Sequence, residues 1–349
     1  MNSVLFIASQ FSQSVREICL FGNGLINDTF LVTTDSSRFV LQRINSHVFS
    51  HPEWIMGNLQ TLNHHVDGKN SGEVKLQIPG ILTSQNNDIA FYDNYGDCWR
   101  ALEFIEHSAS LETIAGQNDA EQTGFALGHF HRLLSDLNPA KLHDTLPGFH
   151  ITPGYLEHYQ SLSNGQSSEK LSPESRFCAE FINAFQDSAY TLEMAKQRGL
   201  LPVRVIHGDP KLNNFLFHQQ TRQAISLIDL DTVKPGLVHY DIGDCLRSCC
   251  HQYETDKFDI EICAHLLKAY LLEAGAFFTE QDYRLLYSAI ELIPFELGLR
   301  FYTDYLEGNR YFKVAEPEEN LSRAVAQFRL CESIRAQKKA LKQLIEDCK

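Results

Sequence analysis

The first part of the chain alternates short apolar runs with polar turns, which is typical of antiparallel strands. The apolar runs lie at 18–34, 38–44, 89–93 and 98–105. Between the second and the third run, residues 53–66 follow Pro52 and repeat their apolar positions at helical spacing. This part of the sequence therefore predicts a mostly antiparallel sheet with one helix.

From about residue 106 the apolar positions recur at the spacing of helices instead. Helices are predicted at 119–137, 173–200, 258–275, 279–306 and 317–348, and the one at 279–306 is predicted to be interrupted at Pro294. Short apolar runs at 203–206, 215–217 and 224–230 predict strands inside this helical region. The predicted fold class is α+β in two lobes, an antiparallel-sheet N-lobe at 1–105 and a mainly helical C-lobe at 106–349.

Composition limits the classes of partner. The chain has 349 residues, enough for two lobes around a shared cleft, and its net charge of −14 repels phosphate backbones and anionic membranes. No stretch approaches the ~20 apolar residues of a membrane span, and no basic leader is present. The cysteines form no CxxC pair and the histidines no HExxH pattern, which argues against zinc. We expect a cytoplasmic protein without nucleic-acid or membrane partners; its oligomeric state is unknown from the sequence.

Polar residues gather between two apolar runs in 205-VIHGDPKLNNFLF-217. Asp209 and Asn214 are five positions apart, and Asp229 follows on the next predicted strand. Phosphoryl transfer needs a carboxylate that accepts the proton of the acceptor hydroxyl, together with an amide oxygen and a second carboxylate that hold Mg²⁺ on the nucleotide. The alternative is a surface turn. A turn leaves unexplained the two carboxylates of 227-LIDLDT-232, which are costly in an apolar strand unless exposed or bound to a cation.

The strings 207-HGDPKLNN-214 and 228-IDLDT-232 resemble the aminoglycoside phosphotransferase and choline kinase-like family, small-molecule kinases with a protein-kinase-like fold. The resemblance implies that Asp209 is the catalytic base, that Asn214 and Asp229 bind Mg²⁺, and that ATP donates the phosphate.

The same resemblance assigns roles to the neighbours of these residues. His207 would order the loop, and Asp241 in the segment after the metal aspartate would hold it through hydrogen bonds. Asp231 stands where many members carry a second acidic residue, a metal ligand or a substrate contact. Lys211 matches the lysine of Ser/Thr protein kinases that contacts the transferred phosphate. An exposed loop lysine is the alternative for Lys211.

The nucleotide loop is expected in 22-GNGLINDTFLV-32, where Gly22 and Gly24 allow backbone N–H groups near phosphate and where Asn27 and Thr29 add donors. An ordinary hairpin is the alternative for this segment taken alone.

In such kinases a positively charged residue, usually lysine, on the strand predicted here at 38–44 binds the nucleotide phosphates, yet no lysine occurs before Lys69. Arg43 is the predicted substitute, because its planar fork binds phosphate, whereas Gln42 faces the other side of the strand. The helix acid that pairs with such a cation is unclear, since Glu53 is the only acidic residue in that helix. Phe104 and Ile105, in the connection between the lobes, are expected to take the adenine through their backbone.

The phosphate acceptor is expected at 296-ELGLRFYTDYLEGNRYF-312, which combines arginines and tyrosines near a Gly-Asn turn. With the glycine loop and the catalytic loop, this segment is similar to the N-acetylhexosamine 1-kinases within the family. That similarity implies a sugar acceptor phosphorylated at its anomeric hydroxyl and contacted by Arg300 and Tyr311, with Asp231 as a further substrate contact. Two alternatives remain: a kinase of the same fold acting on an amino alcohol or aminoglycoside, and a nucleotide-binding pseudokinase.

Overall fold

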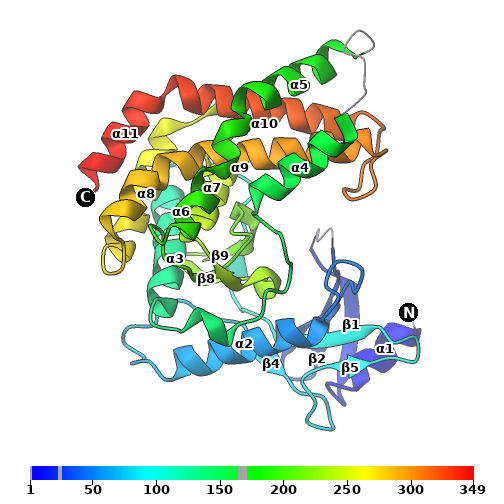
Figure 1. Ribbon diagram of the computed structural model, residues 1–349. Helices are drawn as coiled ribbons and strands as arrows, with labels where there is room; N and C mark the ends of the chain where they lie inside the picture. Colours follow the sequence, from blue (N-terminus) through cyan, green and yellow to red (C-terminus); the bar gives the residue numbers. More distant parts are fainter. Residues whose placement is uncertain (1, 23–25, 164–170) are drawn as a thin grey trace.

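The first lobe is built on an antiparallel sheet with the strand order β1-β2-β3-β6-β4, and β5 also pairs with β6. The structure, a computed structural model, describes residues 2–22, 26–163 and 171–349. The strands are β1 (Val15–Leu20), β2 (Asp28–Thr34), β3 (Arg38–Arg43), β4 (Ile81–Leu82), β5 (Phe91–Tyr92) and β6 (Cys98–Glu103). This lobe lies at the lower right of Figure 1, where the N-terminus also lies.

Helix α1 (Asn2–Ser9), which the sequence pattern did not predict, covers one face of this sheet. Its Ile7 and Ala8 are buried with Phe39 and Leu41 of β3 and with Trp99 and Ala101 of β6. Because side chains alternate along a strand, the intervening residues of β3 and β6 point to the opposite face. That opposite face therefore turns toward the rest of the molecule.

The second lobe is mainly helical and carries most of the hydrophobic core. Its larger helices are α3 (Gln117–Leu134), α4 (Thr152–Ser163), α5 (Pro173–Phe185), α6 (Thr191–Gln197), α7 (Val238–Cys249), α8 (Ile260–Ala274), α9 (Glu280–Leu306), α10 (Glu319–Ala336) and α11 (Lys338–Asp347). Helices α3 and α8 approach closely at Gly124, where an added Cβ would stand 2.0 Å from the carbonyl oxygen of Leu266. In Figure 1, α9 and α10 run side by side at the top, and α2 (Pro52–Asp67) lies below them, at the bottom of the molecule.

Short strands lie between the two lobes. The strands β8 (Arg204–Ile206) and β11 (Lys234–Gly236) form one antiparallel pair, and a second small sheet has the order β10-β9-β7. Its members are β7 (Ser108–Ala109), β9 (Phe215–His218) and β10 (Ala224–Leu227). The loops that leave β8 and β10 contain the predicted catalytic and metal residues.

The predicted fold class is confirmed: the chain has an antiparallel-sheet lobe and a helical lobe, arranged as in protein kinases. The boundary near residue 105 remains our proposal. One prediction is wrong, because α9 runs without a break through Pro294. Pro294 is buried between Ile293 and Phe295 of the core, and this packing maintains the helix despite the lost backbone hydrogen bond.

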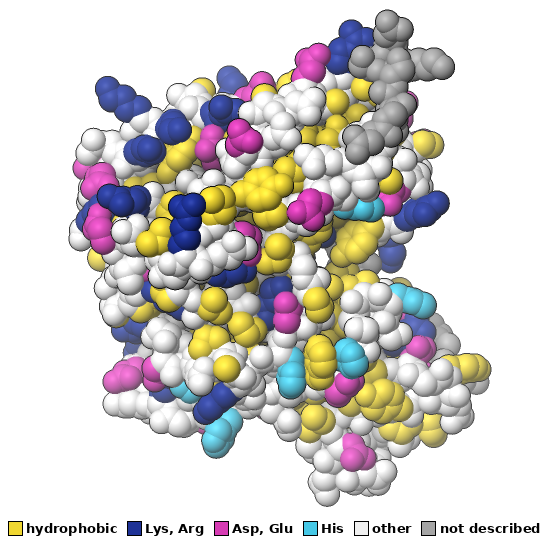
Figure 2. Space-filling model, viewed as in Figure 1, with side chains coloured by type: hydrophobic (Ala, Val, Ile, Leu, Met, Phe, Trp, Pro, Cys, Tyr) yellow, Lys and Arg dark blue, Asp and Glu magenta, His cyan; other side chains and the backbone are white. Residues whose placement is uncertain are grey.

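The surface is hollowed between the upper and the lower lobe in the view of Figure 2, and acidic and basic side chains are interspersed over the face shown there. Within the described part of the chain, no helix combines the length and the apolar character that a membrane crossing requires.

Candidate active site

The loop after β8 is held by Asp241 on α7. One carboxylate oxygen of Asp241 accepts the backbone N–H of His207 at 2.6 Å, and the other accepts that of Gly208 at 2.9 Å. Nε2 of His131 lies 2.8 Å from the same carboxylate. Burial opposes ionisation of Asp241, but the hydrogen bond and charge of His131 outweigh it and keep the pKa of this carboxyl below its ordinary value. The predicted role of Asp241 in holding the loop is confirmed.

The same loop is joined to the segment that carries the second carboxylate. His207 accepts the N–H of Asp209 at Nδ1 (3.2 Å), so its Nε2 carries the proton and donates to the carbonyl of Ile228 (2.9 Å). Gly208 has a φ of +89°, and a Cβ there would lie 2.6 Å from the carbonyl oxygen of Thr232. Only glycine fits this position, which brings the two loops into contact. His207 therefore orders the loop as predicted.

The carboxylate of Asp209 is paired with the ammonium group of Lys211. Burial lowers the pKa of Lys211, but the charges of Asp209 and Asp229 outweigh it and raise the pKa above its ordinary value. Lys211 is therefore charged, and about a third of its side chain is exposed. The structure places Lys211 beside Asp209, and its contact with the transferred phosphate stays a prediction.

The side-chain oxygens of Asn214 and Asp229 accept no hydrogen bond from a described side chain. The amide nitrogen of Asn214 donates to the carbonyl of Asp209 at 2.7 Å, which leaves its amide oxygen available. Asp229 is exposed, holds a left-handed conformation with φ 64°, and receives no side-chain hydrogen bond from a described residue. A backbone hydrogen bond of 2.9 Å from Ile228 to Asn214 keeps the two positions adjacent.

These two oxygen donors fit a hard divalent cation. In the described part of the chain, no cluster of three or more His, Cys, Asp or Glu side chains could hold a metal ion. Mg²⁺ does not require such a cluster, because it binds through one or two carboxylates while substrate phosphates and water complete its shell. Asn214 and Asp229 therefore fit Mg²⁺ carried in on a nucleotide.

Asp231 is fully buried at the junction of the lobes. Its carboxylate forms an ion pair with the guanidinium of Arg100 and accepts a hydrogen bond of 2.7 Å from the amide of Asn27. Burial raises the pKa of Asp231 and the charge of Arg100 lowers it, and the net shift is upward. Arg100 in turn donates to the side-chain oxygen of Gln42 through Nε (3.0 Å) and Nη2 (2.7 Å).

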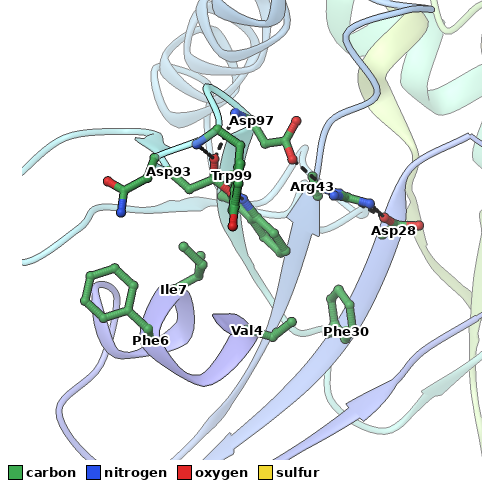
Figure 3. A pocket seen from close by; sticks show the side chains of 11 residues that line it. Val4, Phe6, Ile7, Asp28, Phe30, Arg43, Asp93, Asp97 and Trp99 are labelled. Carbon is green, nitrogen blue, oxygen red and sulfur yellow. Dashed lines mark hydrogen bonds and ion pairs between the residues drawn. The ribbon is translucent and has the colours of Figure 1, made fainter. Parts of the chain in front are cut away.

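The structure does not bring Arg43 to this junction, which corrects its prediction as the phosphate-binding cation. Arg43 lies on the α1 face of the sheet, in ion pairs with Asp28 and, at 3.1 Å, with Asp97 (Figure 3). There it lines a pocket of about 280 Å³ together with residues of α1 and the ring of Trp99. The reason is the alternation of β3, which turns Gln42 rather than Arg43 toward the cleft.

The predicted nucleotide residues lie in the loop between β1 and β2, at the start of β2, and in the connection after β6. Gly22 has a φ of +73°, whereas Gly24 falls outside the described residues. The hydroxyl of Thr29 accepts a hydrogen bond from Gln42 at 3.1 Å. The rings of Phe21, at the start of the glycine loop, and Phe104, in the connection, pack edge to face with centroids 5.9 Å apart. The glycine loop and the connection therefore adjoin, as a nucleotide site requires.

Ile105 follows Phe104 and is buried. Its carbonyl accepts the hydroxyl of Ser108 at 2.6 Å, while its backbone N–H donates to no described residue. That N–H is therefore one group of the connection that is available to a nucleotide base.

Arg300 on α9 lies among four aromatic rings. Its guanidinium carbon is 5.1 Å from the ring centre of Phe149, 5.2 Å from Tyr155, 5.4 Å from Phe312 and 5.7 Å from Tyr311. No described carboxylate forms an ion pair with it. Burial lowers the pKa of Arg300, but the surrounding groups raise it above its ordinary value. The structure brings Arg300 and Tyr311 together as predicted.

Other polar residues of the predicted acceptor segment serve the fold. Asp304 accepts the backbone N–H groups of Arg310 (2.8 Å), Tyr311 (2.8 Å) and Phe312 (3.0 Å), and so shapes the turn that presents Tyr311. The hydroxyl of Tyr302 is buried and donates to the carbonyl of Ser175 at 3.0 Å.

A buried ion pair that the sequence analysis missed links α9 to the catalytic loop. His150 places Nδ1 2.9 Å from the carboxylate of Glu296 and Nε2 2.7 Å from the carbonyl of Gly208. Both partners are acceptors, so both ring nitrogens carry protons. Burial lowers the pKa of His150, but Glu296 outweighs it and raises the pKa above 6.5. Glu296 lies one helical turn before Arg300, so this pair connects the acceptor side to Asp209.

Arg100, His150 and Glu296 were all missed because each is a single polar residue without a motif. For Arg100 a signal existed in the apolar string 98-CWRALEFI-105, since a charge inside an apolar strand is tolerated only if it is paired. For His150 and Glu296 the sequence holds no comparable signal.

Comparisons with known proteins agree with this geometry. The chain matches the model described as the phosphotransferase enzyme family (APH) over residues 17–286. A microcompartment-associated aminopropanol kinase is 14% identical, with a TM-score of 0.68 and 98% of each chain covered. A spectinomycin phosphotransferase solved with ADP and spectinomycin is 12% identical, with a TM-score of 0.63 and 97% of this chain and 98% of that chain covered.

An amicoumacin kinase solved with AMP-PNP, Ca²⁺ and its substrate is 16% identical, with a TM-score of 0.59 and 96% of this chain and 93% of that chain covered. At such identities these structures show the common fold. The family match extends from β1 into α9 and so contains both loops of the site. Because it covers well over half of the chain, the protein belongs to the phosphotransferase enzyme family that includes the aminoglycoside phosphotransferases.

Proposed function

We propose that the protein transfers the terminal phosphate of Mg²⁺-bound ATP to the anomeric hydroxyl of an N-acetylhexosamine. The observation that carries the proposal is the position of Asp209. Its carboxylate pairs with Lys211, its backbone carbonyl accepts the amide N–H of Asn214, and its negative charge helps to raise the pKa of the aromatic-lined Arg300. A base therefore stands between a site suited to a metal-bound phosphate and a site suited to a polar, ring-shaped acceptor.

The nucleotide part of the proposal is supported by the edge of the cleft. The backbone of the glycine loop at Gly22 and Gly24, with Asn27 and Thr29, would lie over the phosphates, and Phe104 and Ile105 would receive the adenine. Family relatives support this part, since one was solved with ADP and another with AMP-PNP and Ca²⁺. When Mg²⁺ is bound by Asn214 and Asp229, it supplies positive charge that offsets the developing charge on the phosphates.

The residues of the chain would then act as follows. Asp209 orients the acceptor hydroxyl and accepts its proton, as an anomeric hydroxyl is acidic enough for a carboxylate to assist. Lys211, charged beside Asp209, neutralises the transferred phosphate. Asp241 and His207 keep the loop in place through the hydrogen bonds described above, so little reorganisation is needed during transfer.

The charge of Arg300 favours a neutral sugar over an amine. Glu296, four residues before Arg300 on the same helix, is already paired with His150, so the guanidinium keeps its net positive character. A cationic amino alcohol placed beside it would be repelled, whereas hydroxyl and acetamido oxygens accept its N–H donors. The rings of Tyr155 and Tyr311 offer flat apolar surfaces for a sugar. Asp231, by contrast, is buried and bound to Arg100, so we no longer propose it as an acceptor contact.

The test is ADP release by the purified protein with Mg²⁺ and ATP. The acceptors are N-acetylglucosamine, N-acetylgalactosamine, the free hexoses, choline and an aminoglycoside. Turnover on the N-acetyl sugars with a blocked reducing end in the product is expected. The variant Asp209→Asn should lose at least about 10³-fold in kcat and retain nucleotide binding. Turnover on the amines alone would agree with a kinase of this family but reject an N-acetylhexosamine as its acceptor. An active Asp209→Asn variant would reject Asp209 as the catalytic base.

A further inference from the structure

We propose that Arg100 is the residue that binds the phosphates of the nucleotide, and that its ion pair with Asp231 replaces the strand lysine and helix glutamate of protein kinases. The inference rests on the nucleotide part of the proposed function and does not depend on which acceptor is used. In protein kinases, the lysine stands on the third strand and its acidic partner on the following helix. Here neither position carries the expected residue.

The position of Arg100 meets the requirement for such a cation. Arg100 of β6 pairs in register with Gln42 of β3, on the sheet face opposite to α1. Its side chain is only 2% exposed and extends to Asp231, which lies two residues after the predicted metal ligand Asp229. A guanidinium at this point is adjacent to the place where metal-bound phosphates would lie.

The hydrogen bonds of Arg100 leave part of its fork unused. Nε and Nη2 donate to Gln42, and Nη2 also donates to Asp231. No described residue accepts a hydrogen bond from Nη1. This atom is not among the fully buried side-chain atoms that lack a partner. Its two N–H groups are therefore available to an anion, and a guanidinium binds phosphate through such paired donors.

Helix α2 supplies no acid to this site, which explains why the partner comes from the other lobe. Glu53 is exposed and lies 2.9 Å from the ring of His51. The buried polar residue of α2 is Asn58, whose amide donates to the carbonyls of His143 and Val233, each at 2.9 Å. A buried arginine requires a carboxylate, and Asp231 provides it.

Asp231 also binds Asn27, a residue of the glycine loop. Asn27 donates to its second carboxylate oxygen at 2.7 Å and accepts the backbone N–H of Asn45 at 2.9 Å. Residues from the glycine loop, from β6 and from the metal loop therefore meet at one carboxylate. Asp231 is thus a positioning residue, which sets Arg100 and the glycine loop relative to Asp229.

The experiment measures binding of ATP, ADP and adenosine to the full-length protein by calorimetry, with Mg²⁺ and without any acceptor. Arg100→Gln is expected to weaken ATP and ADP binding about 10- to 100-fold, because charged hydrogen bonds are lost. Adenosine has no phosphate, so its affinity should change by less than about 2-fold. Arg43→Gln is the matched control, since this arginine of the neighbouring strand faces away from the cleft, and all three affinities should be retained.

Two further variants protect the test against misfolding. Arg100→Lys keeps the charge but not the fork and should weaken ATP binding several-fold, and Asp231→Asn should do the same with adenosine binding retained. Wild-type ATP affinity in folded Arg100→Gln and Arg100→Lys would overturn the proposal. A parallel loss of adenosine and ATP binding would also overturn it, because it indicates a structural role. The binding assay contains no acceptor, so its result does not depend on the sugar. Absence of turnover on sugars in the separate kinase assay would reject only the proposed acceptor.

Discussion

Replacing Glu296 by glutamine tests the buried pair that joins α9 to the catalytic loop. The side chains of His150 and Glu296 are 4% and 2% exposed, and the second carboxylate oxygen accepts the hydroxyl of Thr152 at 2.7 Å. Glutamine has nearly the same shape and can keep both contacts if the threonine hydroxyl reverses. The substitution therefore removes the negative charge while it leaves the packing unchanged.

The expected loss follows from these contacts. Two charge-assisted hydrogen bonds become neutral ones, each weaker by about 1 kcal/mol, so the free energy of unfolding should fall by about 2 kcal/mol near pH 6. Deleting one partner of a buried pair outright costs more, about 3–5 kcal/mol, because it leaves an uncompensated charge. His150→Phe is the variant for that comparison.

The raised pKa of His150 determines how the stability difference between wild type and Glu296→Gln changes with pH. In the wild type the pKa of His150 is raised above 6.5, so its contribution to stability is fully present below pH 6.5 and is lost as the pH rises through the folded-state pKa. Without the charge of Glu296, the main cause that raises the pKa of His150 is lost, and burial lowers this pKa relative to the wild type. The difference in stability between wild type and Glu296→Gln should then shrink as the pH is raised.

The assay is urea unfolding followed by circular dichroism at several pH values between 5.5 and 9, with kcat measured in parallel. Because His150 holds the carbonyl of Gly208, the residue before Asp209, kcat should fall with stability in the variant. A stability difference that is constant over this pH range would refute the assignment of a protonated His150. A variant as stable as the wild type at pH 6 would refute the ion pair itself.

Two further substitutions test the loop that carries Asp209. Gly208→Ala forces a side chain into a φ of +89° and against Thr232, which should cost about 3 kcal/mol and most of kcat. Gly154→Ala, where a Cβ meets no atom within 4 Å, is the control, and equal losses in both would contradict the argument. Asp241→Asn should cost about 2–4 kcal/mol at pH 7. The lowered pKa of Asp241 means that this difference should fade as the pH drops below 3.8, and a loss that persists there would show another cause.

Most of the architecture could be read from apolar spacing. The predicted helix at 279–306 corresponds to α9, and the predicted strand at 203–206 corresponds to β8. Helix α1 was missed because an eight-residue apolar stretch does not distinguish a helix from a strand without the sheet on which it packs. Pro294 was misinterpreted because local propensity disfavours proline in a helix, whereas burial in the core retains it there.

The predicted catalytic loop could be recognised from the sequence itself. Asp209 and Asn214 lie five residues apart on one short segment, so local geometry alone keeps them together. Asp229 comes two residues after the end of β10, the strand that pairs with β9, and its position is nearly as local. Residues that are close along the chain have few ways to separate, and this is why their spacing could be interpreted.

Only the tertiary structure decided which cation reaches the cleft. Arg43 and Arg100 both lie on strands of one sheet, and the sequence alone does not tell which face of that sheet α1 covers. Once α1 packs on the face of Leu41 and Trp99, Arg43 is turned to the outside and Arg100 to Asp231, more than a hundred residues away in the chain. Such a choice depends on long-range packing, because a strand presents alternate residues to opposite faces and carries no local signal for which face is buried.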